Sequence, residues 1–240
     1  MRCAIAATLL LCLSGRTASA QGTAIFRYHV TWWDAASVSA GGILHFMPAA
    51  LGMPKGAPSC APCDPATIPG IDRWAVRPLV AAADVGSDVA IAAVVGWTAL
   101  SGLRGLPARQ WQGNLAVFAN TATWTAASAE WLKVLVRRRR PILYTSDAAA
   151  AAGVRASQMS MPSGHTALAF AAATSYLVLS AREHLPDRRR NAVLLYAGAV
   201  GVGALRVAAG KHFPTDVIAG AALGSAIGWL VPTIHRGDYR

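Results

Sequence analysis

From about residue 85 onward, the chain is built from five apolar segments, and their length narrows the folds available to it. Each segment is rich in Ala, Val, Leu and Gly and comes close to the roughly 20 residues that cross a bilayer as a helix. We therefore predict an all-α helical bundle with five transmembrane helices. A soluble bundle with an Ala/Gly-rich core is the alternative, because the segments are short for membrane spans. The segments are Val85–Leu103, Gly113–Leu132, Gly164–Ala181, Asn191–Ala208 and Thr215–Val231.

The composition agrees with a membrane location. Hydrophobic residues make up 54% of the chain and charged residues only 14%, which is more apolar than an ordinary soluble domain. The net charge of +11 comes from basic residues in the short gaps between apolar runs. Nucleic-acid-binding domains instead carry basic residues on a polar surface with interleaved aromatic residues. We therefore expect a membrane and a phosphorylated lipid as partners, and no nucleic acid. The sequence does not indicate an oligomeric state.

The first twenty residues have the three regions of a secretory signal. Arg2 precedes an apolar run over residues 4–13, and Ala18-Ser19-Ala20 follows it. We predict cleavage after Ala20, with an uncleaved anchor as the alternative. The expected organisation is then a signal peptide (1–20), a Pro/Gly-rich periplasmic segment (21–84) with a short helix near Ala35–Leu51, a catalytic helical domain (85–232) and a basic tail (233–240).

The charge of the linkers predicts an orientation in a bacterial-type inner membrane. Arg104 and Arg109 lie in the first linker, and Arg182 and Arg188–Arg190 lie in or next to the third. The positive-inside tendency places these linkers in the cytoplasm, so the other linkers face the periplasm. Five crossings after an exported N-terminal segment return the C-terminus to the cytoplasm.

Cys60 and Cys63 form a C-A-P-C sequence in a Pro-rich stretch. In an exported chain this pattern favours a structural disulfide. A redox motif is the alternative, but no strand-then-helix pattern surrounds the cysteines. A zinc site is not indicated, because no second Cys or His pair has matching spacing.

Three short stretches in the periplasmic linkers carry the chemistry. In the first, Lys133 and Arg140 are seven residues apart and share one face of a helix that Pro141 ends. In the second, Pro162 to His165 reads PSGH at the start of an apolar segment, where Ser163 suits an N-cap. The free N–H groups and the dipole at such a helix start favour an anion.

The third stretch surrounds the turn between the last two apolar segments. Arg206 precedes the turn, and His212 and Asp216 are four residues apart across it. This spacing allows a carboxylate–imidazole pair, which sets the tautomer of the histidine and leaves its other nitrogen free to attack. Each stretch alone also fits a purely structural role at a helix end. Their combination on one side of the membrane favours a phosphate-handling site.

The combined pattern resembles that of the type 2 phosphatidic acid phosphatase (PAP2) superfamily, which includes bacterial acid phosphatases and vanadium haloperoxidases. That family's pattern is K-x6-RP, then PSGH, then SR-x5-H-x3-D. The chain reads Lys133-x6-Arg140-Pro141, then Pro162 to His165, then Arg206-x5-His212-x3-Asp216. The resemblance covers roughly residues 85–232 and implies a helical bundle of the PAP2/haloperoxidase type. One departure is Leu205, which stands where the family usually has Ser.

The resemblance also implies roles for these residues. His212 is expected to be the nucleophile that forms a phosphohistidine, and Asp216 to orient it. His165 is expected to protonate the leaving oxygen and then to activate water. The residues expected to hold the phosphate are Lys133, Arg140, Ser163, Gly164 and Arg206. Because cations stabilise the transition-state charge, we expect no metal and no other cofactor.

We therefore predict a metal-independent phosphatase that hydrolyses a phosphate monoester or diphosphate of a membrane lipid, either phosphatidate-like or a polyprenyl diphosphate. Its active site is expected to face the periplasm. A soluble periplasmic acid phosphatase is the main alternative, and a vanadate-dependent haloperoxidase is a further one. A non-enzymatic alternative is a membrane protein that binds or moves anionic lipid. It fits less well, because every charged position of the pattern is present.

Overall fold

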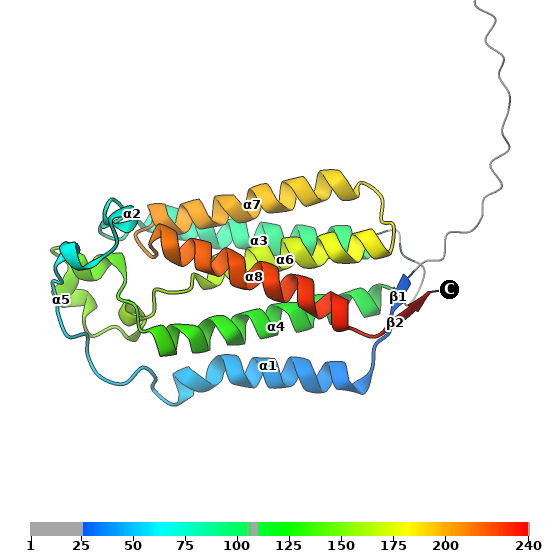
Figure 1. Ribbon diagram of the computed structural model, residues 1–240, viewed down its shortest axis with the longest axis horizontal. Coiled ribbons are helices and arrows are strands. Elements are labelled where there is room, and N and C mark those ends of the chain that lie inside the picture. Colours follow the sequence, from blue (N-terminus) through cyan, green and yellow to red (C-terminus); the bar gives the residue numbers. More distant parts are fainter. Residues whose placement is uncertain (1–25, 105, 107–109, 240) are drawn as a thin grey trace, which may run out of the picture.

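A computed structural model describes residues 26–104, 106 and 110–239 of the chain, and in this part six long helices run side by side (Figure 1). The short helices gather at one end of the bundle, and two short strands pair at the other end (Figure 1). The long helices are α1 (Trp32–Ala50), α3 (Ala81–Leu103), α4 (Gln110–Val136), α6 (Gly164–Arg182), α7 (Arg188–Ala208) and α8 (Pro214–Ile234). The short elements are β1 (Phe26–Tyr28), η1 (Pro65–Thr67), α2 (Gly70–Arg73), η2 (Pro141–Tyr144), α5 (Ala148–Ala151), η3 (Arg155–Gln158) and β2 (Gly237–Tyr239).

The prediction of a helical bundle is confirmed, and the five apolar segments lie within α3, α4, α6, α7 and α8. The predicted signal peptide lies outside the described residues. The short helix expected near residues 35–51 is instead the 19-residue helix α1, which makes six long helices rather than five. It begins earlier because Asp34 accepts the backbone N–H of Thr31 at 2.7 Å, within a capping box.

Helix α1 is an integral part of the bundle because it packs along α4. The indole N–H of Trp124 donates to Ser37 Oγ at 2.9 Å, and the indole N–H of Trp131 donates to the carbonyl of Leu44 at 2.9 Å. These two contacts lie at different heights on α1. The helix therefore follows α4 over most of its length instead of lying across the end of the bundle (Figure 1).

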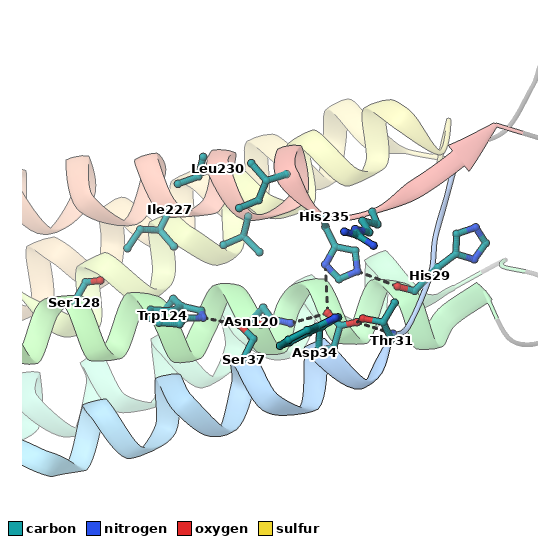
Figure 2. A pocket seen from close by; sticks show the side chains of 14 residues that line it. His29, Thr31, Asp34, Ser37, Asn120, Trp124, Ser128, Ile227, Leu230 and His235 are labelled. Atoms are coloured by element: carbon teal, nitrogen blue, oxygen red, sulfur yellow. Dashed lines mark hydrogen bonds and ion pairs between the residues drawn. The ribbon is translucent and has the colours of Figure 1, made fainter.

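The start of α1 lies beside the C-terminal end of α8, where a cavity of about 590 Å³ opens (Figure 2). Asp34 accepts from Asn120 at 3.2 Å, and His235 Nδ1 lies 3.5 Å from the same carboxylate. Strand β1 pairs antiparallel with β2 nearby. Residues 26–31 therefore lie at the end of the bundle away from the three sequence motifs. Residues 51–80 lie at the opposite end, so the stretch predicted as one periplasmic segment (21–84) has described parts at both ends of the bundle.

Helices α6 and α8 approach each other closely through three glycines of α8. A Cβ atom would lie 2.5 Å from the Ser163 carbonyl oxygen at Gly220, 2.0 Å from the Ala167 oxygen at Gly224 and 2.5 Å from the Ala171 oxygen at Gly228. Any larger residue would therefore push the two backbones apart. Because Ser163 begins α6 and Gly220 lies near the start of α8, this contact also sets the distance between two of the sequence motifs.

The outer faces of several helices are apolar and exposed. Val89 on α3, Val193 on α7 and Ile218 on α8 each expose more than 60% of their surface. In the described part of the chain, α3, α7 and α8 are the three helices that are long and apolar enough to cross a membrane. Helices α4 and α6 carry more polar residues, and many of these face the interior, among them Asn114, Thr125, Thr166 and Ser175.

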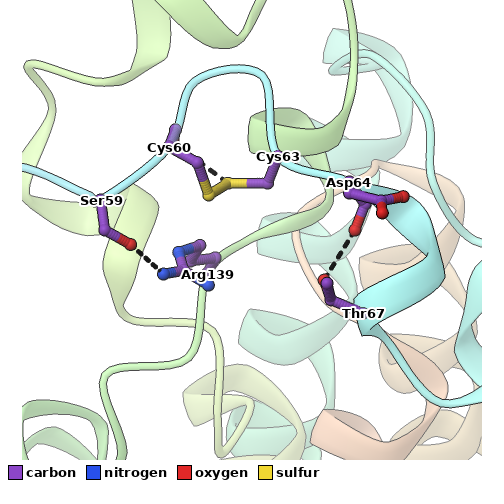
Figure 3. Close-up of a disulfide and its surroundings, with 6 residues drawn as sticks. All are labelled: Ser59, Cys60, Cys63, Asp64, Thr67 and Arg139. Carbon is purple, nitrogen blue, oxygen red and sulfur yellow. Dashed lines mark hydrogen bonds between the residues drawn. A yellow bond between two sulfur atoms is a disulfide. The ribbon is translucent and has the colours of Figure 1, made fainter.

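Residues 51–80, here called the cap segment, wrap around the motif end of the bundle. Cys60 and Cys63 are joined by a disulfide, and Arg139 donates to Ser59 beside it (Figure 3). The Cys63 N–H donates to the Leu143 carbonyl at 2.8 Å. At the other end of the segment, Ile68 and Ala75 pack with Val207 and Phe213 in a small buried cluster. The cap segment is thus held to η2 through Leu143 and to the turn between α7 and α8 through Val207 and Phe213.

We expect Gly224→Ala to lower both thermal stability and turnover. Its Cβ would lie 2.0 Å from the Ala167 oxygen, which is backbone and has no rotamer with which to move aside. Overpacking of this kind costs about 1–3 kcal/mol. Melting temperature and phosphate release in detergent are the measurements. Gly201→Ala on α7 is the matched control, since no described atom beyond its chain neighbours and its own helix backbone lies within 4 Å of its Cβ position. Unchanged stability and activity in Gly224→Ala would show that the bundle tolerates a wider α6–α8 spacing.

Candidate active site

The three sequence motifs meet at the end of the bundle where α4 and α7 end and α6 and α8 begin. Lys133 lies in the last turn of α4, and Arg206 lies in the last turn of α7. A Cβ on Gly164 would lie 3.2 Å from Lys133 Nζ, so the ammonium group sits directly beside the start of α6. The Ser163 N–H donates to the Asp216 carbonyl at 2.9 Å, which joins the starts of α6 and α8. Residues more than 80 positions apart in the sequence thus share one site.

His212 is buried, with 1% of its surface exposed. Its Nδ1 lies 2.6 Å from the carbonyl oxygen of Ser160. A carbonyl can only accept, so Nδ1 carries the proton and Nε2 carries the free lone pair. Burial and the charges of Arg140 and Arg206 lower the pKa of His212 to about 3, although Asp216 acts in the opposite direction. The imidazole is therefore neutral at physiological pH, which a nucleophile requires.

Asp216 makes shorter contacts with the residues around His212 than with the imidazole ring itself. Its Oδ2 is 3.7 Å from His212 Nδ1, which is longer than a hydrogen bond. The same oxygen accepts the Ser160 hydroxyl at 2.5 Å and the Phe213 N–H at 2.8 Å. The expected direct pair of carboxylate and imidazole is thus replaced by a connection that runs through Ser160. Asp216 orients Ser160, and the Ser160 carbonyl orients the imidazole.

The expected phosphate-binding cations lie close enough to repel one another. Burial and the nearby charge of Arg206 lower the pKa of Arg140 to about 10, so Arg140 still carries its charge at neutral pH. Within the described residues, the Nε atoms of Arg140 and Arg206 are buried without a hydrogen-bond partner. Buried guanidinium groups with unused donors beside a helix start form a site suited to a phosphate.

The PSGH stretch occupies the N-terminus of α6, as expected. Ser163 is at the N-cap position, but its side chain makes no capping hydrogen bond and instead accepts from Thr166 at 3.0 Å. The Ser163 hydroxyl proton is therefore left for another acceptor. His165 lies in the first turn, and its Nε2 is 2.8 Å from Asp88 Oδ1 on α3. Leu205 lies near Gly86, also on α3, where an added Cβ would be 3.8 Å from the Leu205 side chain.

Carboxylates that the sequence analysis did not single out also line this end. Asp84 binds both Arg206 at 2.7 Å and Lys211 at 2.8 Å. Asp84 and Asp88 are one helical turn apart at the start of an apolar segment, and charge in such a position is a signal that could have identified them. Their side chains balance part of the positive charge that the motifs bring together.

Arg138 lies between Lys133 and Arg140 in the sequence, and it faces the interior rather than the solvent. It forms ion pairs with Asp72 at 2.7 Å and with Asp216 at 2.6 Å, and only 16% of its side chain is exposed. Arg137 and Arg139 instead contact the cap segment, at Lys55 and Ser59.

Across residues 26–104, 106 and 110–239, no group of three or more His, Cys, Asp or Glu side chains is placed to hold a metal ion.

Comparison with known proteins identifies relatives of the chain. Residues 114–240 match the model of the PAP2 superfamily. The decaprenylphosphoryl-5-phosphoribose phosphatases of two strains of Mycobacterium tuberculosis are 34% identical to the chain over 150 residues, which is 61% of this chain and 75% of the relatives.

Among solved structures, the crystal structure of a transmembrane PAP2-type phosphatidylglycerolphosphate phosphatase from Bacillus subtilis covers 85% of this chain and 96% of its own. The sequence identity is 21% and the TM-score is 0.44, so this likeness bears on neither fold nor substrate. The family model, by contrast, covers more than half of the chain, and it includes all three motifs. The chain therefore belongs to the PAP2 superfamily and is a phosphatase of that family.

Proposed function

We propose that the chain is a membrane phosphatase that hydrolyses a lipid-borne phosphate without a metal, through a phosphohistidine on His212. The observation that carries this proposal is the geometry of His212. Its Nδ1 proton is held by the Ser160 carbonyl at 2.6 Å, and its Nε2 lone pair is free within a cluster of buried cations. A neutral, oriented imidazole beside unused guanidinium donors suits attack on a phosphorus atom.

In the first step, Nε2 of His212 attacks phosphorus as the bond from phosphorus to the leaving oxygen breaks. His165 donates a proton to that oxygen. The positive charge that develops on the imidazole is stabilised by Asp216, through Ser160 and its own carboxylate. The transferring phosphoryl group is held by Lys133, Arg140, Arg206, the Ser163 hydroxyl and the Gly164 N–H.

In the second step, His165 takes a proton from a water molecule as its oxygen attacks the phosphohistidine. The bond between phosphorus and Nε2 breaks, inorganic phosphate leaves, and His212 regains its neutral form. His165 suits both steps because it lies at the edge of the site, with 34% of its side chain exposed, whereas His212 is enclosed.

The membrane location is supported by the outer surface of the bundle. Soluble proteins rarely expose contiguous apolar areas of this kind. Helices α3 and α8 are apolar along a full membrane span, yet only 22% of that span is buried in each. A lipid environment explains these exposed faces, and a soluble acid phosphatase does not. The relatives' names state a polyprenyl phosphosugar substrate. We therefore place the substrate of this chain among phosphate monoesters on polyprenyl-linked or glycerol-based lipid headgroups.

We expect lipid-borne substrates to be turned over with about 100-fold higher kcat/KM than a soluble monoester, because binding of the lipid part lowers the barrier at the phosphate. Phosphate release in detergent would be measured for phosphatidate, phosphatidylglycerophosphate, polyprenyl diphosphate, a polyprenyl-phosphoryl pentose 5-phosphate and p-nitrophenyl phosphate. Full solubility without detergent, with p-nitrophenyl phosphate as the best substrate, would instead identify a soluble acid phosphatase.

His212→Ala is expected to lower turnover by roughly 10⁴-fold or more while the protein stays folded. Labelled substrate should leave an acid-labile phosphohistidine in the wild-type protein and none in the variant. Because no metal takes part in the proposed mechanism, EDTA should leave the wild-type rate unchanged. Exposed His184, at the far end of the bundle, gives the control variant His184→Ala. Retained activity in His212→Ala would remove the nucleophile assignment, and loss of activity with EDTA would contradict the metal-independent mechanism.

The bundle predicts that the two ends of α1 lie on opposite sides of the membrane. In a background without the native cysteines, Lys55→Cys should react with a membrane-impermeant maleimide in intact cells. Val30→Cys, at an exposed position on the far end, should react only after permeabilisation. Reaction of Val30→Cys in intact cells would instead support an N-terminal segment that lies entirely outside.

A further inference from the structure

Two buried carboxylates from distant parts of the chain share a single arginine behind the candidate active site. Asp72 belongs to α2 in the cap segment and Asp216 to the first turn of α8, and both are 0% exposed. Arg138, between α4 and η2, lies between them. Taking two carboxylates out of water is costly unless each is paired and fully hydrogen-bonded. The hydrogen bonds and ion pairs of the cluster therefore offset the desolvation of its charges only if all its members are in place.

The contacts within the cluster are short and directional. Arg138 donates from one terminal nitrogen to Asp72 at 2.7 Å and from the other to Asp216 at 2.6 Å. The Thr215 hydroxyl accepts from Arg138 at 2.5 Å and donates to Asp72 at 2.6 Å. Asp72 also accepts the Thr215 backbone N–H at 3.1 Å. Asp72 thus holds both the arginine and the first turn of α8.

The guanidinium plane is fixed from a further side by an aromatic ring. Arg138 lies over Phe213, 4.6 Å from the ring centre, and Phe213 is fully buried beside His212 in the sequence. Burial alone would lower the pKa of Arg138, but its hydrogen bond to Asp72 and the charge of Asp216 raise this pKa above its usual value. Its charge is therefore permanent, and its orientation depends on having a carboxylate at each terminal nitrogen.

A continuous set of contacts leads from this cluster to the imidazole. Arg138 holds Asp216 Oδ1, and Asp216 Oδ2 accepts the Ser160 hydroxyl at 2.5 Å. The carbonyl of the same Ser160 accepts Nδ1–H of His212 at 2.6 Å. If the guanidinium turned, Asp216 and then Ser160 would lose their positions. The direction of Nε2 would change with them.

We propose that Asp72 is a positioning residue for the phosphoryl transfer: acting through Arg138, Asp216 and Ser160, it sets the direction of the His212 lone pair. The cap segment is on this account a component of the active site. Asp72 itself touches neither the substrate nor the reacting atoms. The inference rests on the proposed nucleophilic role of His212.

The test is Asp72→Asn, which keeps the side-chain shape but removes the charge that pairs with Arg138. We expect kcat to fall about 10–100-fold, as small misplacements of reacting groups do. KM and inhibition by vanadate, a phosphate analogue, should change less than about threefold, because the phosphate-binding cations stay in place. Asp64→Asn is the matched control: it lies in the same segment, and its carboxylate caps the Ala66 N–H on the surface.

A double-mutant cycle with Arg138→Gln separates positioning from general stability. If Asp72 acts through Arg138, the double variant should lose little more than the worse single variant. Independent, additive losses would overturn the proposal, as would wild-type kcat in Asp72→Asn or equal losses of kcat and vanadate binding. Should Asp72→Asn fail to fold, Thr215→Val removes the bridging hydroxyl at constant shape and is expected to lower kcat in the same selective way.

A spectroscopic measurement keeps this inference distinct from the proposed function. In protein with ¹⁵N-labelled histidine, the Nδ1 proton held by Ser160 should give a downfield signal that His212→Ala abolishes. Asp72→Asn should shift that signal, and Asp64→Asn should not. Absence of phosphatase activity in the wild-type protein would overturn the proposed function. An unmoved signal in Asp72→Asn would overturn the positioning role alone.

Discussion

The close approach of α6 and α8 is the contact on which the site depends. Three glycines spaced four residues apart on α8 let its backbone meet the carbonyls of α6 without intervening side chains. Because both helices begin at the motif end, the N–H of Ser163 reaches the carbonyl of Asp216. The start of α6, which we propose binds the phosphate, and the turn that carries His212 are thereby held together. A wider spacing would leave the same residues present but unable to act on one phosphate.

The second constraint is electrostatic. Lys133, Arg140 and Arg206 would repel one another if the site held cations alone. Carboxylates on surrounding elements reduce this repulsion without filling the role of a phosphate: Asp84 pairs with Arg206, and Glu130 pairs with Lys133. In the described part of the chain, the Nε–H groups of Arg140 and Arg206 donate to no partner. The site is thus positive enough to attract an anion and balanced enough to remain folded.

The cap segment and α1 show how the part of the chain before residue 81 contributes. Helix α1 extends the bundle along α4, while the cap segment encloses the motif end and supplies Asp72. Neither function could be read from periodicity. The cap segment is held by contacts to chain segments far away, such as Cys63 with Leu143, rather than by its own helical pattern.

The sequence alone predicted the helices α3, α4, α6, α7 and α8, because each contains a long and mainly apolar run, but it predicted only a short helix in place of α1. It also supplied the candidate reacting groups, because the Lys133–Arg140, PSGH and Arg206–His212–Asp216 spacings pointed to a family that the comparisons then showed. The local sequence pattern was enough to predict these motifs, because a turn and a helix start are each built from neighbouring residues.

Only the tertiary structure decided the partners of those groups. The hydrogen bond from His212 to Ser160, the ion pair of His165 with Asp88 and the arginine shared by Asp72 and Asp216 all join residues more than 50 positions apart. A spacing rule predicts which side chains share one helix face, but it carries no information about which distant carboxylate will be folded against them. That choice is made by the packing of the helices, since a buried charge is tolerated only where another element brings its counterpart.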